Sequence, residues 1–152
     1  MNREPTLITL KDMFEPNGGI AITWGQTKAL DPANDYDTVA SEIIRKYLGE
    51  RRRAGSGYYA PPEERHEEVV ARHFGRLEIV GEDGAFNFRN RRTVEGVLGL
   101  LYSTSFASPY LFGDQLDAFE RDIGQALLQL QPSGVFEEMV TLGAILAWVA
   151  AS

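Results

Sequence analysis

Four hydroxyl-bearing residues interrupt an apolar helical pattern in the second half of the chain. They are Tyr102, Ser103, Thr104 and Ser105, and they follow an apolar stripe that ends at Leu101. Hydroxyl groups in such a break either line a pocket or bond to free backbone groups at a helix end. Residue types alone leave both interpretations open, and the first would make this segment a ligand contact.

The glycine-rich segments do not fit a nucleotide-binding loop. A dinucleotide-binding loop has the spacing Gly-x-Gly-x-x-Gly and stands after a strand and before a helix. Gly18 and Gly19 precede an apolar strand pattern instead. Gly55-Ser56-Gly57 has neither a third glycine nor a strand pattern before it. We therefore interpret both segments as turns.

Acidic residues and histidines supply two weaker candidates for metal sites. Asp31–Glu42 follows part of a calcium-loop spacing, but Tyr36 stands where that loop needs glycine. We expect its acidic residues to lie at the N-terminus of a helix instead. His66 and His73 are two helical turns apart, which is too far to share one metal ion, and we expect both to be solvated.

Arginines gather in two short clusters. One is Arg51–Arg53, and the other consists of Arg89, Arg91 and Arg92. Clusters of three cations in an acidic chain usually form a solvated face. A small anionic substrate is the alternative for these clusters.

Composition excludes several classes of function. The 152 residues carry a net charge of −7 and no cysteine, so disulfides and thiolate chemistry are excluded and neither nucleic acid nor an anionic membrane is expected as a partner. The longest apolar stretch, Met139–Ala151, is shorter than the ~20 residues of a membrane-spanning helix. Residues 1–6 lack the apolar region of a signal peptide, and we expect a cytoplasmic protein.

Hydrophobic periodicity predicts one α/β domain over residues 1–152. The segment Phe14–Gly25 predicts a glycine turn followed by a short strand over 20–24. This apolar, β-branched run suits a strand buried on both faces, as in a parallel sheet. Helices are predicted at about 5–14, 36–53, 62–73, 93–101 and 116–130, and extended segments at 77–80, 85–89 and most of 135–150. A helix is the alternative for residues 135–150, because alanine and leucine are frequent there.

The order of these motifs resembles the C-terminal half of class I S-adenosylmethionine (SAM)-dependent methyltransferases, in particular small-molecule, type 11-like members. Residues 14–22, Phe-Glu-Pro-Asn-Gly-Gly-Ile-Ala-Ile, resemble the segment that leads into the fifth strand of that family. Residues 66–80 resemble the next helix and the sixth strand. Residues 93–105 resemble the substrate-side helix with its Ser-x-Ser break, and residues 119–138 resemble the last helix and the seventh, antiparallel strand. The resemblance covers nearly the whole chain.

The resemblance implies an α/β fold with a partial Rossmann-like methyltransferase sheet, made of the family's strands 5, 6 and 7, with helices on both faces and a helical substrate cap. It implies substrate-binding roles for Trp24, at the carboxyl end of the first strand, and for Tyr102, Ser103 and Ser105. The family binds SAM with its first four strands, and no residue of this sequence matches those motifs. We therefore expect no cofactor, no metal and no catalytic residue in this chain alone.

The same resemblance predicts a partner surface. In the family, strand 5 pairs with strand 4, so Gly19–Trp24 is expected to be an apolar sheet edge with unpaired backbone groups. A second copy of the chain, in a homodimer, or a complementing N-terminal half would cover this edge. The function implied is methyl transfer from SAM to a small molecule once the fold is complete, either by complementation or as part of a longer gene product. The alternative is a non-catalytic module that binds a small ligand or another protein.

Overall fold

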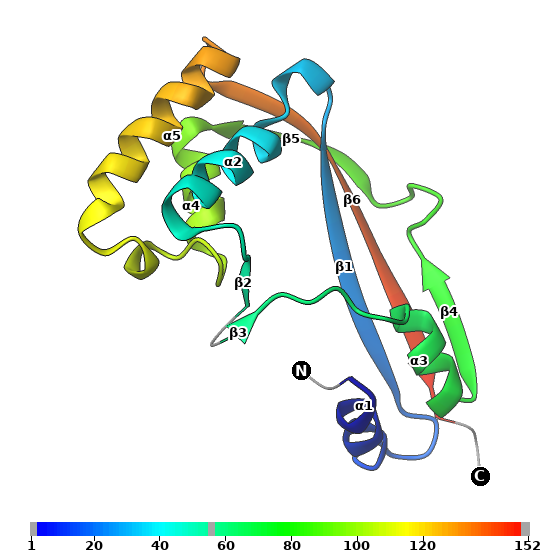
Figure 1. Ribbon diagram of the computed structural model, residues 1–152. Helices are drawn as coiled ribbons and strands as arrows, with labels where there is room; N and C mark the ends of the chain where they lie inside the picture. Colours follow the sequence, from blue (N-terminus) through cyan, green and yellow to red (C-terminus); the bar gives the residue numbers. More distant parts are fainter. Residues whose placement is uncertain (1–2, 55–56, 150–152) are drawn as a thin grey trace. The chain divides into compact units, whose positions relative to one another are not determined.

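The computed structural model describes residues 3–54 and 57–149 (Figure 1). These residues form two compact units. Unit 1 contains residues 3–26, 61–88 and 140–149, and unit 2 contains residues 27–54, 57–60 and 89–139. None of the helices in these residues is long and apolar enough to cross a membrane.

The described residues form five α-helices, six strands and three short 3-10 helices. The α-helices are α1 (Arg3–Lys11), α2 (Tyr36–Leu48), α3 (His66–His73), α4 (Val94–Tyr102) and α5 (Leu116–Leu130). The strands are β1 (Gly19–Ala29), β2 (Arg53–Ala54), β3 (Gly57–Tyr58), β4 (Arg76–Val80), β5 (Asn87–Thr93) and β6 (Val135–Trp148). The 3-10 helices are η1 (Pro32–Asn34), η2 (Pro109–Leu111) and η3 (Gly113–Gln115).

The last strand, β6, is the central strand of a four-stranded sheet with the order β1-β6-β4, and β5 also pairs with β6. In unit 1, β4 runs antiparallel to β6, with Leu77 opposite Ala147 and Ile79 opposite Ile145. The antiparallel direction that the resemblance predicts for the last strand is therefore observed against β4.

Strand β1 is also antiparallel to β6. The Val149 N–H donates to the Gly18 carbonyl in unit 1 at 3.0 Å, and the Leu30 N–H donates to the Glu137 carbonyl in unit 2 at 2.9 Å. Along β1, half-buried residues alternate with exposed ones up to Trp24. The mixed α/β class is confirmed, but the prediction of a strand buried on both faces in a parallel sheet is wrong. An apolar run that is β-branched satisfies a one-sided antiparallel strand equally well.

Unit 1 buries an apolar layer between two helices and the sheet. Helices α1 and α3 lie side by side (Figure 1). Leu7 of α1, Val70 of α3, Phe74 directly after α3 and Ile145 of β6 are buried together, and Ile22 of β1 packs against them half-buried. The prediction that this helix begins at residue 62 is wrong: α3 begins at His66, and residues 61–65, which include Pro61 and Pro62, are irregular.

Unit 2 buries a larger core made by α2, α4, α5 and the first part of β6. Phe119, Ile123 and Leu127 of α5 are fully buried and lie on one face at helical spacing. Phe112 stacks on Phe119 with ring centroids 4.0 Å apart. Phe136 of β6 joins the same cluster and brings the strand against the helices.

Two further predicted element boundaries are wrong. Helix α2 ends at Leu48 rather than near Arg53, because Gly49 adopts a φ of 84°, a conformation that favours glycine. The Gly55-Ser56 part of the turn predicted after this helix lies outside the described residues. Residues 85–86 form a turn, and the extended segment predicted there begins at Asn87.

Candidate functional site

Trp24 lies within β1 and covers a glycine of the neighbouring strand. A side chain at Gly143 would come within 2.2 Å of Trp24 Cζ2, so the indole ring occupies the space above this glycine. The strand continues to Ala29, so the prediction that Trp24 stands at the carboxyl end of its strand is wrong. Polar residues after Trp24 hid this continuation, since both faces of the strand are exposed there.

The predicted hydroxyl cluster ends helix α4 in unit 2, whereas Trp24 belongs to unit 1. The Ser103 hydroxyl donates to the Leu100 carbonyl at 2.6 Å. The Tyr102 hydroxyl donates to Glu120 Oε1 at 2.8 Å, and burial together with this carboxylate raises the pKa of Tyr102. Ser105 is exposed. A substrate-binding role for these residues stays a prediction.

A buried carboxylate on β6 organises the polar interior of unit 2. Glu138 is 1% exposed. Its Oε1 accepts hydrogen bonds from Asn90 Nδ2 and Arg92 Nε, both at 2.7 Å, and its Oε2 accepts one from the Tyr36 hydroxyl at 2.5 Å. A buried charge is tolerated only when it is paired and hydrogen-bonded, and these three donors meet that condition.

The donors around Glu138 come from separate segments of unit 2. Tyr36 is the first residue of α2, and its ring meets that of Phe136 edge-on at 5.4 Å. Burial and the neighbouring carboxylate raise the pKa of Tyr36, so its hydroxyl remains a donor at neutral pH. Because both Glu138 oxygens are occupied and enclosed, we assign this cluster to positioning α2 and β5 on β6 rather than to proton transfer.

This cluster also corrects a sequence prediction. Arg92 was expected on a solvated face, but its side chain is only 24% exposed and pairs with Glu138. Arg91 does lie on the outside, where it pairs with the exposed Glu137 at 3.4 Å. The sequence analysis did not predict a role for Glu138, although this residue lies between the apolar residues Phe136 and Val140 on the same face of the strand.

A cleft in unit 2 gathers arginines beside an apolar wall. It has a volume of about 470 Å³ and lies between α2, the segment 49–53 that follows it, and Phe106. Ile44 and Leu48 of α2 line it together with Arg45 and Arg51–Arg53. The Arg52 guanidinium lies 4.0 Å from the centre of the Phe106 ring. The cluster at 51–53 is therefore part of a concave surface.

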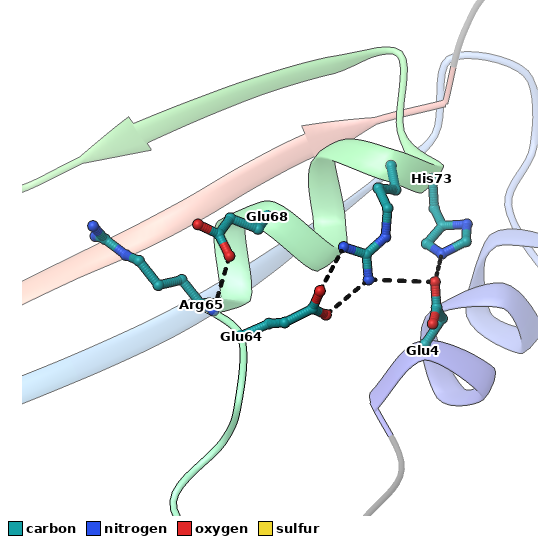
Figure 2. Close-up of polar contacts among 6 residues, drawn as sticks. Glu4, Glu64, Arg65, Glu68 and His73 are labelled. Atoms are coloured by element: carbon teal, nitrogen blue, oxygen red, sulfur yellow. Dashed lines mark hydrogen bonds and ion pairs between the residues drawn. The ribbon is translucent and has the colours of Figure 1, made fainter.

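A second polar cluster lies in unit 1, where α3 meets α1 (Figure 2). His73 Nε2 is 2.8 Å from Glu4 Oε1, and Arg72 Nη2 is 3.5 Å from the same oxygen. Arg72 also donates to both oxygens of Glu64, at 3.2 and 2.9 Å. The expectation of two solvated histidines is correct for His66, which is exposed, and wrong for His73, whose side chain is 21% exposed.

Acidic residues of the calcium-loop spacing, Asp31–Glu42, cap helices. The Asp31 carboxylate accepts from the Ala33 N–H and the Asp35 carboxylate from the Asp37 N–H, so these acids cap η1 and α2 as predicted. Among residues 3–54 and 57–149, no three His, Asp or Glu side chains are grouped so that they could hold a metal ion.

No protein-family model matches this sequence, and no curated protein is significantly similar to it.

Proposed function

We propose that these residues are the substrate-side half of a SAM-dependent methyltransferase that acts on a small molecule. In this proposal the chain is inactive alone and works with a cofactor-binding half that pairs along β1. The type of reaction is taken from the resemblance of the motif order to the methyltransferase family. The arrangement of the sheet is the structural observation that supports the proposal.

The supporting arrangement is the position of β6. The chain's last strand lies between β1 and β4 and runs antiparallel to both. A last strand of reversed direction is what the resemblance predicts for the end of the methyltransferase sheet. β1 then occupies the end of the strand order, where the remainder of such a sheet would continue.

The open edge of β1 is the observation that carries the proposal. Gly18 and Leu30, at the two ends of β1, both bond to the β6 side. Backbone groups of alternate residues point to the same side of a strand, so even-numbered residues of β1 bond to β6 and odd-numbered residues point outward. Among the described strands none pairs with this outer side. A long unpaired edge is a template for another strand.

Calorimetric titration with SAM tests whether the isolated chain lacks the cofactor site, as the proposal requires. The isolated chain should give no heat of binding, since no residue in it matches the family's cofactor motifs. Tight binding of SAM to the isolated chain would refute the proposal. Reading the coding DNA upstream of Met1 for the glycine-rich motif then tells whether the other half belongs to the same product.

The variant Thr23→Pro tests the edge itself. Thr23 is odd-numbered, so proline there removes an outward N–H without removing a bond to β6. We expect the wild-type chain to form a dimer at micromolar concentration by edge pairing, and Thr23→Pro to shift the light-scattering mass toward that of the monomer. Thr23→Val keeps the N–H and should leave the mass unchanged. A wild-type chain that stays a monomer would contradict edge pairing.

A further inference from the structure

The arginine-lined cleft of unit 2 is lined by two chemically different groups of side chains. Ile44, Leu48 and Phe106 give it an apolar wall. Arg45, Arg51, Arg52 and Arg53 bring four guanidinium groups to its lining, against the two carboxylates of Asp37 and Glu50. The excess of cations is local, because the whole chain carries a net charge of −7.

The acidic residues of the cleft leave most of these cations available. Arg45 is the arginine that pairs with a lining acid, and its Nη1 is 4.0 Å from Oε2 of Glu50. That pair is weak because Glu50 is 85% exposed. Arg51 lies over the Tyr58 ring at 4.1 Å, and Arg52 over Phe106. No ion pair joins Arg51, Arg52 or Arg53 to another described residue.

The ring contacts orient the arginines without using their hydrogen-bond donors. A guanidinium stacked on an aromatic face keeps its N–H groups directed outward in its own plane. These donors match the two oxygens of a carboxylate. Ser41, which like Ile44 belongs to α2, adds a neutral hydroxyl donor to the lining of the cleft.

We infer that this cleft binds a small organic carboxylate with an apolar body. The carboxylate is bound by the Arg51–Arg53 segment, and the apolar body lies against Ile44, Leu48 and Phe106. A volume of about 470 Å³ suits a small molecule rather than a polymer. The inference is independent of methyl transfer, and it needs only the isolated chain.

Three matched probes separate the charge from the apolar body. 2-Naphthylacetate carries both, 2-naphthylethanol replaces the carboxylate by a neutral hydroxyl, and acetate lacks the apolar body. NMR titration of the full chain should show saturable binding of 2-naphthylacetate at millimolar concentration or below. Shifts of backbone amides should be centred on residues 44–53 and 106. The alcohol and acetate should each bind about tenfold more weakly or not at all, because each loses one half of the contact.

The double variant Arg51→Gln and Arg53→Gln tests the assigned cations. It should weaken binding of 2-naphthylacetate about tenfold or more, since both charge-assisted donors are lost. Arg89→Gln removes an exposed arginine of β5 outside the cleft and should bind like the wild type. Arg51, Arg53 and Arg89 are all exposed, so we expect both variants to fold like the wild type. Amide spectra that match the wild-type spectrum away from the substituted residues will verify this.

Three outcomes would overturn the inference. They are no binding of 2-naphthylacetate to the folded chain, equal affinity for the acid and the alcohol, and equal weakening by Arg89→Gln and by the double variant. None of these outcomes bears on the proposed methyltransferase half, which depends on SAM and on β1. Conversely, SAM binding by the isolated chain would refute the proposed function and leave the carboxylate site untouched.

Discussion

Each unit contains a carboxylate that binds an arginine and a second donor, but the two carboxylates differ in exposure. Glu138 of unit 2 is 1% exposed and accepts from three side chains. Glu4 of unit 1 has a side chain that is 46% exposed and contacts His73 and Arg72. The two clusters contain similar groups, so a comparison of their variants isolates the effect of burial.

Burial changes what the loss of a partner costs. In water a broken ion pair is replaced by hydration, and exposed pairs contribute only about 0–1 kcal/mol. In an enclosed site the remaining partner keeps its desolvation penalty, so removing one side of a buried pair costs about 3–5 kcal/mol. We therefore expect unit 2 to depend on its carboxylate far more than unit 1 depends on its own.

The largest effect is expected for Glu138→Leu. Leucine would leave Arg92, Asn90 and Tyr36 without their shared acceptor, and the free energy of unfolding should fall by about 3–5 kcal/mol. Urea denaturation followed by circular dichroism measures this change. The adjacent Glu137→Leu is the matched control, because Glu137 is exposed and pairs with exposed Arg91, and its cost should stay below about 1 kcal/mol. Equal losses in the two variants would remove burial as the explanation.

A smaller effect is expected for Tyr36→Phe. The ring and its edge-on contact with Phe136 remain, and only the hydrogen bond to Glu138 is lost. A hydrogen bond to a charged group is worth about 1.5–3 kcal/mol, so the unfolding free energy should fall by that amount. Tyr47→Phe removes a hydrogen bond to the more exposed Asp122 and should cost less. A larger loss for Tyr47→Phe would contradict the comparison.

The smallest effect, and one that depends on pH, is expected for Glu4→Gln. The hydrogen bond from His73, followed by the charge of Arg72, lowers the pKa of Glu4 below its ordinary value of 4.5. A carboxyl group with a lowered pKa adds stability above that ordinary value and loses it as the pH falls through its folded-state pKa. Thermal unfolding should show a slightly higher midpoint for the wild type than for Glu4→Gln at neutral pH. The two midpoints should converge under acid conditions, and a constant difference would exclude Glu4 as the titrating group.

The sequence predicted the helices and strands that can be recognised from the spacing of residues within the element itself. Helix α5 occupies Leu116–Leu130 as expected, because its apolar residues recur at helical spacing without interruption. Helix α4 is confirmed close to its predicted range of 93–101, and Thr93 caps its start, with its Oγ1 accepting from the Gly96 N–H at 3.1 Å. The long last strand is confirmed as β6 over Val135–Trp148, and Ala150 lies outside the described residues.

The sequence could not supply features that depend on pairing between distant segments. Strand direction is set by which neighbour β1 finds, and an apolar run from Ile20 to Trp24 is compatible with either direction. Pairing with β6 also carries β1 through Gln26, Thr27 and Lys28, which have no strand pattern of their own. The partners of Glu138 lie 46 to 102 residues away in the chain, so no local spacing reveals them.

Amide hydrogen exchange along β1 tests most directly whether the open edge is a pairing surface. The inward N–H groups of Ile20, Ile22 and Trp24 serve as internal controls, since the even-numbered residues bond to β6. We expect the outward N–H groups of Ala21 and Thr23 to become protected as protein concentration rises and to lose that protection on dilution. Fast exchange of the outward amides at every concentration, beside slow exchange of the inward ones, would contradict it.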